Sequence, residues 1–301
     1  LVYNKTALER IFSETAGLIA VHAEDEDRKN ERKKLIEGRT DVAAHAFYRD
    51  DITALLATKL SVELARKTGH RLHILHLTSA IEADYLSDIC NLPSKAEGYP
   101  IITTEVLPQH LTFDETDVDE QGVRLQMNPP IRYKHDRETL WQRLVDGTIQ
   151  CIATDHAPHT LEDKLKGFPD APSGMPGVET SLPVMLNYVN QGRCSIEDVV
   201  RWMSTNVADC YRMIGKGKLE IGYDGDIVLV DMNHSAVVED ENSWARVGWN
   251  PFRGRELTGW PVLTVVNGIP VFERSAGTGQ KGRLLVEPGA VGKPLLMEPW
   301  K

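Results

Sequence analysis

The first three-quarters of the chain alternates apolar, strand-like runs with helical segments. Thr6 and Glu9 form a capping-box pattern, which predicts a helix that runs to about Ala16 and stops at Gly17. Four apolar runs have the length and composition of buried strands: 18–22, 71–77, 101–106 and 149–155. Because helical segments separate these runs, the pattern predicts βα units and a parallel sheet.

The pattern changes after a long Gly- and Pro-rich loop that ends at Gly177. Helices are predicted near 178–189, 196–203 and 206–213. Beyond Gly217, short strands are separated by turns, and Asn267-Gly268 is a strong hairpin signal. We therefore expect two domains: residues 1–215, which contain the parallel sheet, and residues 216–301, a small β unit.

Composition and charge exclude several classes of function. The 301 residues include 34 Lys and Arg against 44 Asp and Glu, a net charge of −10. Such an acidic chain is unsuited to nucleic acids and anionic membranes, which bind clustered basic residues. No apolar run approaches the ~18 residues of a membrane span. The four cysteines are widely spaced, which favours reduced thiols in a cytoplasmic protein.

Ionisable residues stand at the ends of three predicted strands: His22, His76 and Asp155. Single residues of this kind are often structural, but two imidazoles and a carboxylate from separate strands are typical ligands of a catalytic Zn²⁺. Catalytic groups in βα barrels gather at this end of the strands. Alternation along 71–77 puts His73 and His76 on opposite faces, so we expect His76 to point inward and His73 toward the outer helices.

Two loops are candidates for substrate binding. Asn128-Pro-Pro-Ile-Arg132 either stiffens a connection or presents an amide to a ligand. The segment that begins at Ser173-Gly174 contains glycines that allow a ligand to approach the backbone closely. The residues by themselves leave both alternatives open for each loop.

Six ordered motifs resemble the signature blocks of bacterial class I dihydroorotases, which belong to the cyclic amidohydrolases of the amidohydrolase superfamily. The blocks are Val21-His-Ala-Glu-Asp25, His73-Ile-Leu-His-Leu-Thr-Ser79, Glu105-Val-Leu-Pro-Gln-His110, Asn128-Pro-Pro-Ile-Arg132, Ala153-Thr-Asp-His-Ala-Pro-His159 and Gly174-Met-Pro-Gly-Val-Glu-Thr180. The segment from Asn250 to Trp260 also resembles the C-terminus of this family.

The resemblance implies an α/β fold, a (β/α)₈ barrel with a small β-sandwich domain. It implies the reversible hydrolysis of L-dihydroorotate to N-carbamoyl-L-aspartate in pyrimidine biosynthesis, by a zinc-activated hydroxide. By motif, His22 and His76 would bind one zinc of a pair. Asp155 would bind the other and act as the proton shuttle. Asn128, His159, Ser173 and Gly174 would bind the substrate.

Several family features have no counterpart in these residues: the HxH pair of the first strand, the adjacent Arg, and the bridging Lys or Asp ligand. We therefore expect an N-terminally truncated chain that carries only the C-terminal half of the barrel and part of the sandwich. We expect this fragment to be poorly soluble and inactive by itself, because open sheet edges promote aggregation.

Two alternatives to dihydroorotase remain. Allantoinases and hydantoinases share the barrel and the metals of this superfamily. A non-catalytic homologue that supports aspartate transcarbamoylase belongs to a different functional class, but such homologues lose metal ligands that this chain retains. The resemblance also implies a small-molecule substrate and a homo-oligomer, with aspartate transcarbamoylase as a further partner.

Overall fold

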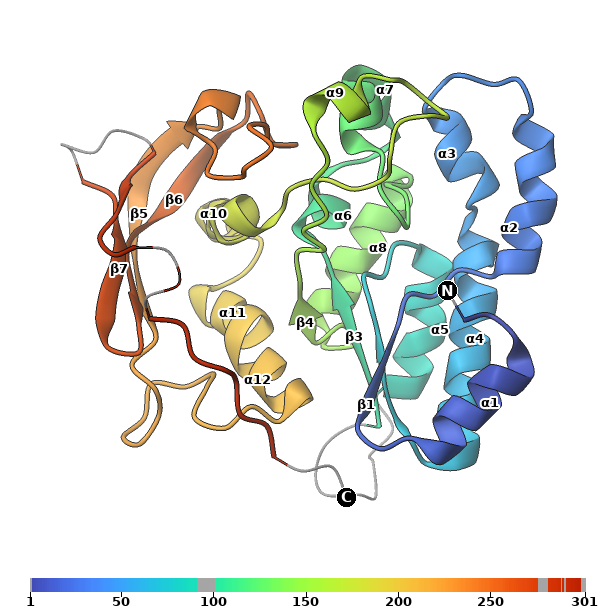
Figure 1. The fold of residues 1–301 in the computed structure, drawn as a ribbon, viewed down its shortest axis with the longest axis horizontal. Helices are drawn as coiled ribbons and strands as arrows, with labels where there is room; N and C mark the ends of the chain where they lie inside the picture. The colour runs from blue at the N-terminus through green and yellow to red at the C-terminus, as the bar shows by residue number, and fades with distance from the viewer. Residues whose placement is uncertain (1, 91–100, 276–280, 288, 290, 299–301) are drawn as a thin grey trace. The chain divides into compact units, whose positions relative to one another are not determined.

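A parallel sheet and an antiparallel sheet lie in different parts of the chain (Figure 1). The structure is a computed structural model, and it describes residues 2–90, 101–275, 281–287, 289 and 291–298. The described residues divide into two compact units. The first contains the chain up to Ala153 together with Glu162–Gly174, and the second contains Thr154–Leu161 and Met175–Glu298.

The first part of the chain alternates helices and strands as predicted. Its elements are α1 (Lys5–Glu14), β1 (Leu18–Val21), α2 (Glu26–Lys33), the 3₁₀ turn η1 (Lys34–Ile36), α3 (Ala43–Tyr48), α4 (Asp51–Thr68), β2 (Arg71–Ile74), α5 (Ala80–Cys90), β3 (Ile102–Val106), α6 (Pro108–Thr112), α7 (Glu115–Gln121), the 3₁₀ turn η2 (Gly122–Leu125), α8 (Lys134–Val145), β4 (Cys151–Ile152) and α9 (Leu161–Lys164).

Local sequence signals explain the helix ends. The Asp50 side chain accepts a hydrogen bond from the Thr53 amide and caps α4, while Gly69 ends the helix with φ of 71°. The start of α1 differs from the prediction: Asn4 rather than Thr6 is the cap, because its side chain accepts a hydrogen bond from the Ala7 amide at 3.0 Å. The Asn4 cap therefore sets the start of α1.

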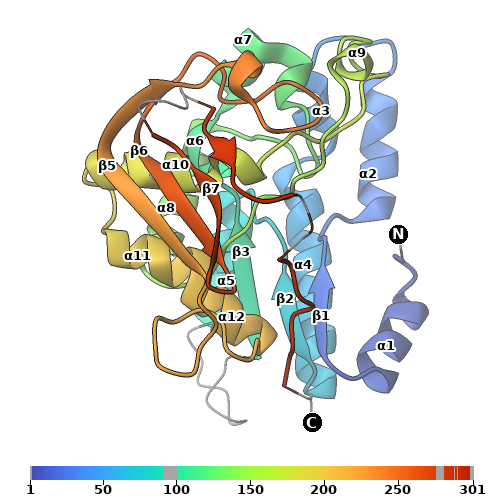
Figure 2. The same ribbon diagram turned by 60° about the vertical axis from the view of Figure 1, so that its left-hand side comes forward.

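The predicted parallel sheet is confirmed, with the strand order β1-β2-β3-β4. Ile19, Leu72 and Ile102 are register partners on one face, and β2 and β3 contact the helices α4 and α5 (Figures 1 and 2). Two strands are shorter than predicted, since β2 ends at Ile74 and β4 contains only Cys151–Ile152. The ionisable residues therefore follow the strands on short loops.

The second unit contains the antiparallel sheet, with the order β5-β6-β7-β8. Its elements are α10 (Val178–Asn190), α11 (Ile196–Val200), the π-helical turn η3 (Arg201–Thr205), α12 (Asn206–Tyr211), β5 (Ile227–Val237), the 3₁₀ turn η4 (Asp240–Asn242), β6 (Glu256–Val266), β7 (Ile269–Glu273) and β8 (Arg283–Leu284). The predicted hairpin at Asn267-Gly268 joins β6 and β7, and both of its residues have positive φ.

Helix α10 packs on β6 in the second unit. Gly259 of β6 makes this approach possible, because a Cβ at this position would lie 2.7 Å from the Leu186 Cβ. The helices α10, α11 and α12 thus group with the antiparallel sheet, whereas the predicted boundary lies at residues 215 and 216. Compact packing units and evolutionary domains need not coincide, and the domain boundary stays a prediction.

The structure also bears on the cysteines and on membrane-spanning helices. The four cysteines, all within the described ranges, form no disulfide. No helix in the described part of the chain combines the length and the apolar character that crossing a membrane requires.

Candidate metal and substrate site

The first unit brings His22 and His76 together. His22 directly follows β1, and His76 follows β2 by two residues. Nδ1 of His22 lies 3.0 Å from Nε2 of His76, and the two rings meet edge to face. A left-handed backbone at His76, with φ of 33°, turns its side chain toward His22. Two imidazole groups thus meet at the carboxyl ends of neighbouring parallel strands.

The environment keeps the His76 imidazole neutral. Burial, together with His22 and His110 nearby, lowers the pKa of His76 to about 3. Its Nδ1 is buried and has no hydrogen-bond partner among the residues that the structure describes. A neutral imidazole is the form that binds zinc, since the metal needs a nitrogen lone pair. The His76 side chain therefore has the chemistry of a metal ligand.

A buried carboxylate, Glu24, orients His22 on the other side of its ring. Nε2 of His22 lies 2.8 Å from Oε2 of Glu24, and the Arg49 guanidinium donates to the same oxygen. Burial raises the pKa of Glu24, but the hydrogen bond from His22 and the charge of Arg49 outweigh it and lower the pKa to about 2. A carboxylate in this position fixes the tautomer and orientation of a metal-binding histidine.

The expectation for His73 is wrong. Ala20, His73 and Thr103 are register partners, so they share the face opposite to Leu72 and its neighbours. The His73 ring bonds to the Thr103 hydroxyl at 2.8 Å and to Glu105 at 3.0 Å. The prediction assumed a regular strand through His76. Because β2 ends at Ile74 and His76 is left-handed, alternation no longer separates the two histidines.

The side chain of Asn128 is held by a buried histidine, His45 of α3. Nε2 of His45 lies 3.0 Å from both the Met127 carbonyl oxygen and Oδ1 of Asn128. Burial, with a contribution from Arg49, lowers the pKa of His45 to about 4. A neutral ring with its proton on Nε2 donates to both oxygens. His45 therefore orients the predicted substrate-binding amide.

The two predicted substrate loops are joined in the first unit. The Gly174 amide donates to the Gln126 carbonyl at 2.9 Å. The Gln126 side-chain amide donates to the Ala171 carbonyl at 2.7 Å and to the Ser173 hydroxyl at 3.3 Å. The segment that contains Asn128 and the segment that contains Ser173 and Gly174 therefore form one hydrogen-bonded structure.

Asp155 and His159 lie in the second unit. Their segment pairs with the residues before α10: the Ala157 amide donates to the Met175 carbonyl at 3.1 Å. The Trp249 indole donates to the His159 carbonyl at 2.8 Å. Asp155 has a left-handed backbone, with φ of 41°. The approach of Asp155 and His159 to the histidine pair of the first unit stays a prediction.

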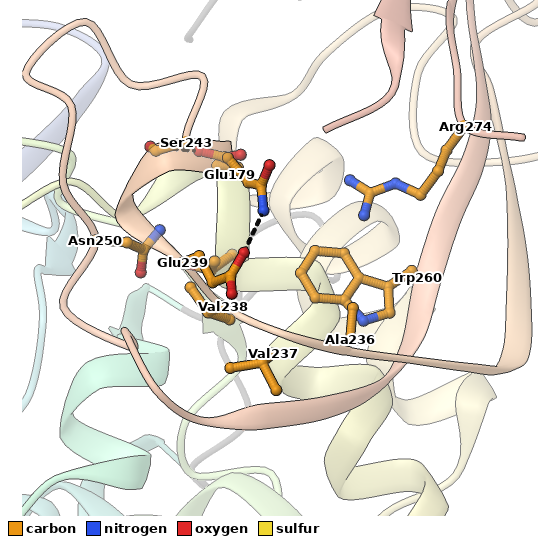
Figure 3. Close-up of a pocket in the computed structure, with 11 residues that line it drawn as sticks. Glu179, Ala236, Val237, Val238, Glu239, Ser243, Asn250, Trp260 and Arg274 are labelled. Carbon is orange, nitrogen blue, oxygen red and sulfur yellow. Dashed lines mark hydrogen bonds between the residues drawn. The ribbon is translucent and has the colours of Figure 1, made fainter. Parts of the chain in front are cut away.

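The second unit also contains a pocket, which is lined in part by residues of α10, β5 and β6 (Figure 3). Glu179 accepts hydrogen bonds from the Ser243 hydroxyl and the Trp244 amide, both at 2.9 Å. The Arg274 guanidinium lies over the Trp260 ring, 4.5 Å from its centre. None of the predicted site residues lines this pocket. Within the described ranges, no group of three or more His, Cys, Asp or Glu residues is arranged to hold a metal ion.

Sequence reasoning missed Glu24, His45 and Glu105 as supports of the site. Glu24 and Glu105 lie inside motifs that resemble the family, so proximity to the site residues was a usable signal. His45 gave no such signal, because it contacts Asn128 across 83 residues of sequence.

Known proteins similar to this chain include several dihydroorotases. The dihydroorotase of Halobacterium salinarum is 35% identical over 279 residues, which are 93% of this chain and 62% of that protein. The dihydroorotase of Pyrococcus horikoshii is 31% identical over 96% of this chain and 62% of its own length. The chain thus spans about three-fifths of the length of these relatives.

Solved structures give the same picture of the fold. The L-hydantoinase (dihydropyrimidinase) of Arthrobacter aurescens matches with a TM-score of 0.84 and 31% identity, over 94% of this chain and 62% of that chain. This similarity confirms the predicted α/β fold class with its amidohydrolase barrel. The expectation of a half barrel stays a prediction. The amidohydrolase family model matches residues 5–271, and the chain therefore belongs to the amidohydrolase family.

Proposed function

We propose that the protein to which this chain belongs is a dihydroorotase, which interconverts L-dihydroorotate and N-carbamoyl-L-aspartate. The observation that carries this proposal is the contact of His22 with His76 at the ends of parallel strands, in a chain similar to proteins named dihydroorotase. The reaction adds water across the ring C–N bond of a cyclic amide, which opens the ring to a carboxylate and a carbamoyl nitrogen.

The residues of the first unit fit part of a zinc centre. His22 and His76 present facing ring nitrogens, and within the described part of the chain the buried Nδ1 of His76 has no hydrogen-bond partner. We propose that these two histidines hold one Zn²⁺ of a pair, and that Asp155 binds the other. When bound, zinc polarises the ring carbonyl and makes water a stronger nucleophile at neutral pH. Glu24 would keep the His22 ring in the orientation for binding.

Asp155 would move the proton. In the hydrolytic direction its carboxylate takes a proton from the attacking water and gives it to the departing ring nitrogen, as a general base and then a general acid. In ring closure the same carboxylate removes the proton from the carbamoyl nitrogen. One group serves both directions because the two reactions pass through the same transition state.

The substrate-binding roles fall to four other residues. We propose that the Asn128 amide, oriented by His45, bonds to the polar edge of the ring. The backbone of Ser173 and Gly174 would contact the same substrate, and His159 would face its carboxylate. His159 pairs with that carboxylate when protonated and donates a hydrogen bond when neutral.

A hydantoinase is the second candidate, because the solved L-hydantoinase of Arthrobacter aurescens matches this chain at 31% identity. Dihydroorotate differs from hydantoins and dihydrouracil in its ring carboxylate. A positively charged or donating partner for that carboxylate therefore separates the two functions, and His159 is the proposed one.

The test is steady-state kinetics of the full-length protein with dihydroorotate, hydantoin, dihydrouracil and allantoin, in both directions, with zinc content measured. We expect turnover of dihydroorotate, and the reverse reaction with N-carbamoyl-L-aspartate. Turnover of hydantoin or dihydrouracil with none of dihydroorotate would assign the second candidate. Folded, zinc-loaded protein with no activity on any cyclic amide would favour the scaffold alternative.

Oligomerisation and partners are also proposals. We propose a homo-oligomer and an association with aspartate transcarbamoylase, both of which sedimentation of the full-length protein with and without that enzyme would detect. The inactivity of the 301-residue chain by itself is tested by the same kinetic assay on the separately expressed chain.

A further inference from the structure

A buried lysine, Lys164 at the end of α9, contacts both of the segments that contain the predicted substrate-binding residues. Its side chain has no exposed surface. The Nζ atom donates to the carbonyl of Gln126 at 2.9 Å, of Pro172 at 2.9 Å and of Gly174 at 3.0 Å. All four residues belong to the first unit. One side chain thus connects two segments that lie far apart in the sequence.

The chemistry of this arrangement matches an ammonium group. An ammonium has three N–H donors and no acceptor, and three carbonyl oxygens surround it here. Burial lowers the pKa of Lys164 to about 8, which still leaves the charged form in the majority at neutral pH. Burying a charge is costly unless it is fully hydrogen-bonded. The three carbonyls accept all three donors, and among the described residues no carboxylate pairs with Lys164.

The three carbonyls also need the lysine. Carbonyl oxygens that converge on one point repel each other through their partial negative charges, so a cation between them stabilises the convergence. Gln126 precedes Asn128 by two residues, while Pro172 and Gly174 flank Ser173. Since the C=O and N–H of a trans peptide point in opposite directions, fixing the Pro172 carbonyl also directs the Ser173 amide away from Lys164.

We propose that Lys164 is a positioning residue that sets the relative geometry of segments 126–128 and 172–174 and so determines the affinity for the cyclic-amide substrate. The proposal rests on the proposed function in one respect, since that function assigns these two segments to the substrate. It differs from a role in stability alone, which would lower the melting temperature and leave the KM of the folded enzyme unchanged.

The test compares Lys164→Met, Lys164→Gln and Lys166→Met in the full-length protein. Methionine fills the space and removes every donor, while glutamine retains an amide that can donate to two carbonyls. Lys166 is exposed and pairs with Asp163, so it is a matched control two residues away. Kinetics with dihydroorotate, and hydrogen exchange of the amides of residues 126–128 and 173–174, are measured for each variant.

For Lys164→Met we expect a KM at least about 10-fold higher, with a smaller change in kcat and faster exchange in both segments, because loose positioning weakens binding. Lys164→Gln should show a smaller rise in KM than Lys164→Met. If the methionine variant does not fold, the glutamine variant is compared with the wild type instead. Lys166→Met should match the wild type.

A folded Lys164→Met variant with wild-type KM would overturn the proposal, whether or not exchange accelerates, because the lysine would then be only structural. A wild-type enzyme that turns over hydantoin rather than dihydroorotate would refute the proposed function alone. In that case the KM for hydantoin and the exchange rates decide the role of Lys164. If the wild type turns over none of these substrates, unchanged exchange in the methionine variant refutes the positioning role of Lys164, and faster exchange in both segments supports it.

Discussion

Asp155 is the residue on which the proposed mechanism depends most. Asparagine retains its shape but is a far poorer base. General acid–base catalysis contributes about 10²- to 10⁴-fold, so Asp155→Asn should lower kcat toward dihydroorotate by at least about 100-fold. Kinetics in both directions, with zinc content checked, measure the effect. The exposed Asp170 serves as the control, and Asp170→Asn should leave kcat unchanged. Near-normal kcat in the Asp155 variant with full zinc would remove this residue from the mechanism.

His159 should affect binding more than chemistry. If its contact with the substrate carboxylate is equally strong in the ground state and the transition state, its loss raises KM and leaves kcat nearly unchanged. We expect His159→Asn to raise the KM for dihydroorotate by a factor of about 10, the value of one good charge-assisted hydrogen bond. The KM for a ring without a carboxylate, such as dihydrouracil, should not rise. An equal rise for both rings would contradict the assignment.

Single residues could be predicted from the sequence where a motif contains them. His22 and His76 follow apolar runs, and the structure brings them within 3.0 Å of each other. His45 and Lys164 could not be predicted in the same way. His45 contacts Asn128 at a separation of 83 positions, and Lys164 contacts Gln126 at a separation of 38, so their roles depend on tertiary contacts that no local pattern encodes.

At the level of elements, the sequence predicted which strands exist better than where they end. Periodicity identified β1 to β4, but it extended β2 through His76, and the inference about His73 failed for that reason. Alternation of side chains holds only while the backbone stays extended. The left-handed residue His76, two positions after the end of β2, interrupts this alternation, and nothing in the sequence from His73 to His76 predicts that turn.

The contact of α10 with β6 is the element packing most sensitive to a single atom. Gly259 has φ of 106°, and an added Cβ would lie 2.7 Å from the Leu186 Cβ. We expect Gly259→Ala to lower the free energy of unfolding by about 2 kcal/mol more than a glycine replacement without a clash, because overpacking costs about 1–3 kcal/mol.

Gly222→Ala is the matched control for this comparison. Gly222 has a similar φ, 98°, but no atom of the described residues lies within 4 Å of the added Cβ. Urea unfolding of both variants separates backbone strain, which is similar in the two, from the clash with α10. Equal losses in the two variants would mean that β6 moves away from the helix without cost.

For the whole molecule, the alternation of helices and strands was sufficient to predict an α/β fold, and turn signals predicted the antiparallel tail. The grouping of α10 to α12 with that tail was not predictable, because it depends on which surface α10 covers. A helix in the sequence shows its apolar face but does not identify the sheet against which it packs.

The stability of the molecule should depend on pH through Glu82, which is buried in α5. Burial raises its pKa from 4.5 to about 7. Between these values the unfolded chain is ionised and the folded one is protonated, so stability falls as pH rises through this window, by roughly 3 kcal/mol in total. Glu82→Gln retains the side-chain shape and removes this ionisation.

Urea unfolding at pH 4.5, 6 and 8 checks this expectation. The Glu82→Gln variant should gain stability relative to the wild type as pH rises from 4.5 to 8. The exposed Glu63 on the preceding helix α4 supplies the control, and Glu63→Gln should follow the wild type at every pH. If the difference in unfolding free energy between Glu82→Gln and the wild type is the same at all three pH values, ionisation of Glu82 does not cause the pH dependence.

The left-handed backbone of Asp155 has a consequence for how its variants should be judged. Among residues other than glycine, asparagine tolerates this conformation best, and aspartate follows it. Loss of activity after a substitution is often attributed to misfolding. Misfolding predicts a lower melting temperature for Asp155→Asn, whereas loss of the catalytic carboxylate alone does not. In metal-free protein, Asp155→Asn should melt at the wild-type temperature or above it, although turnover by the zinc-loaded variant collapses. Catalysis and thermal stability would then favour different residues at this position. Melting temperatures of variants at the other site residues would identify further positions where the two properties conflict.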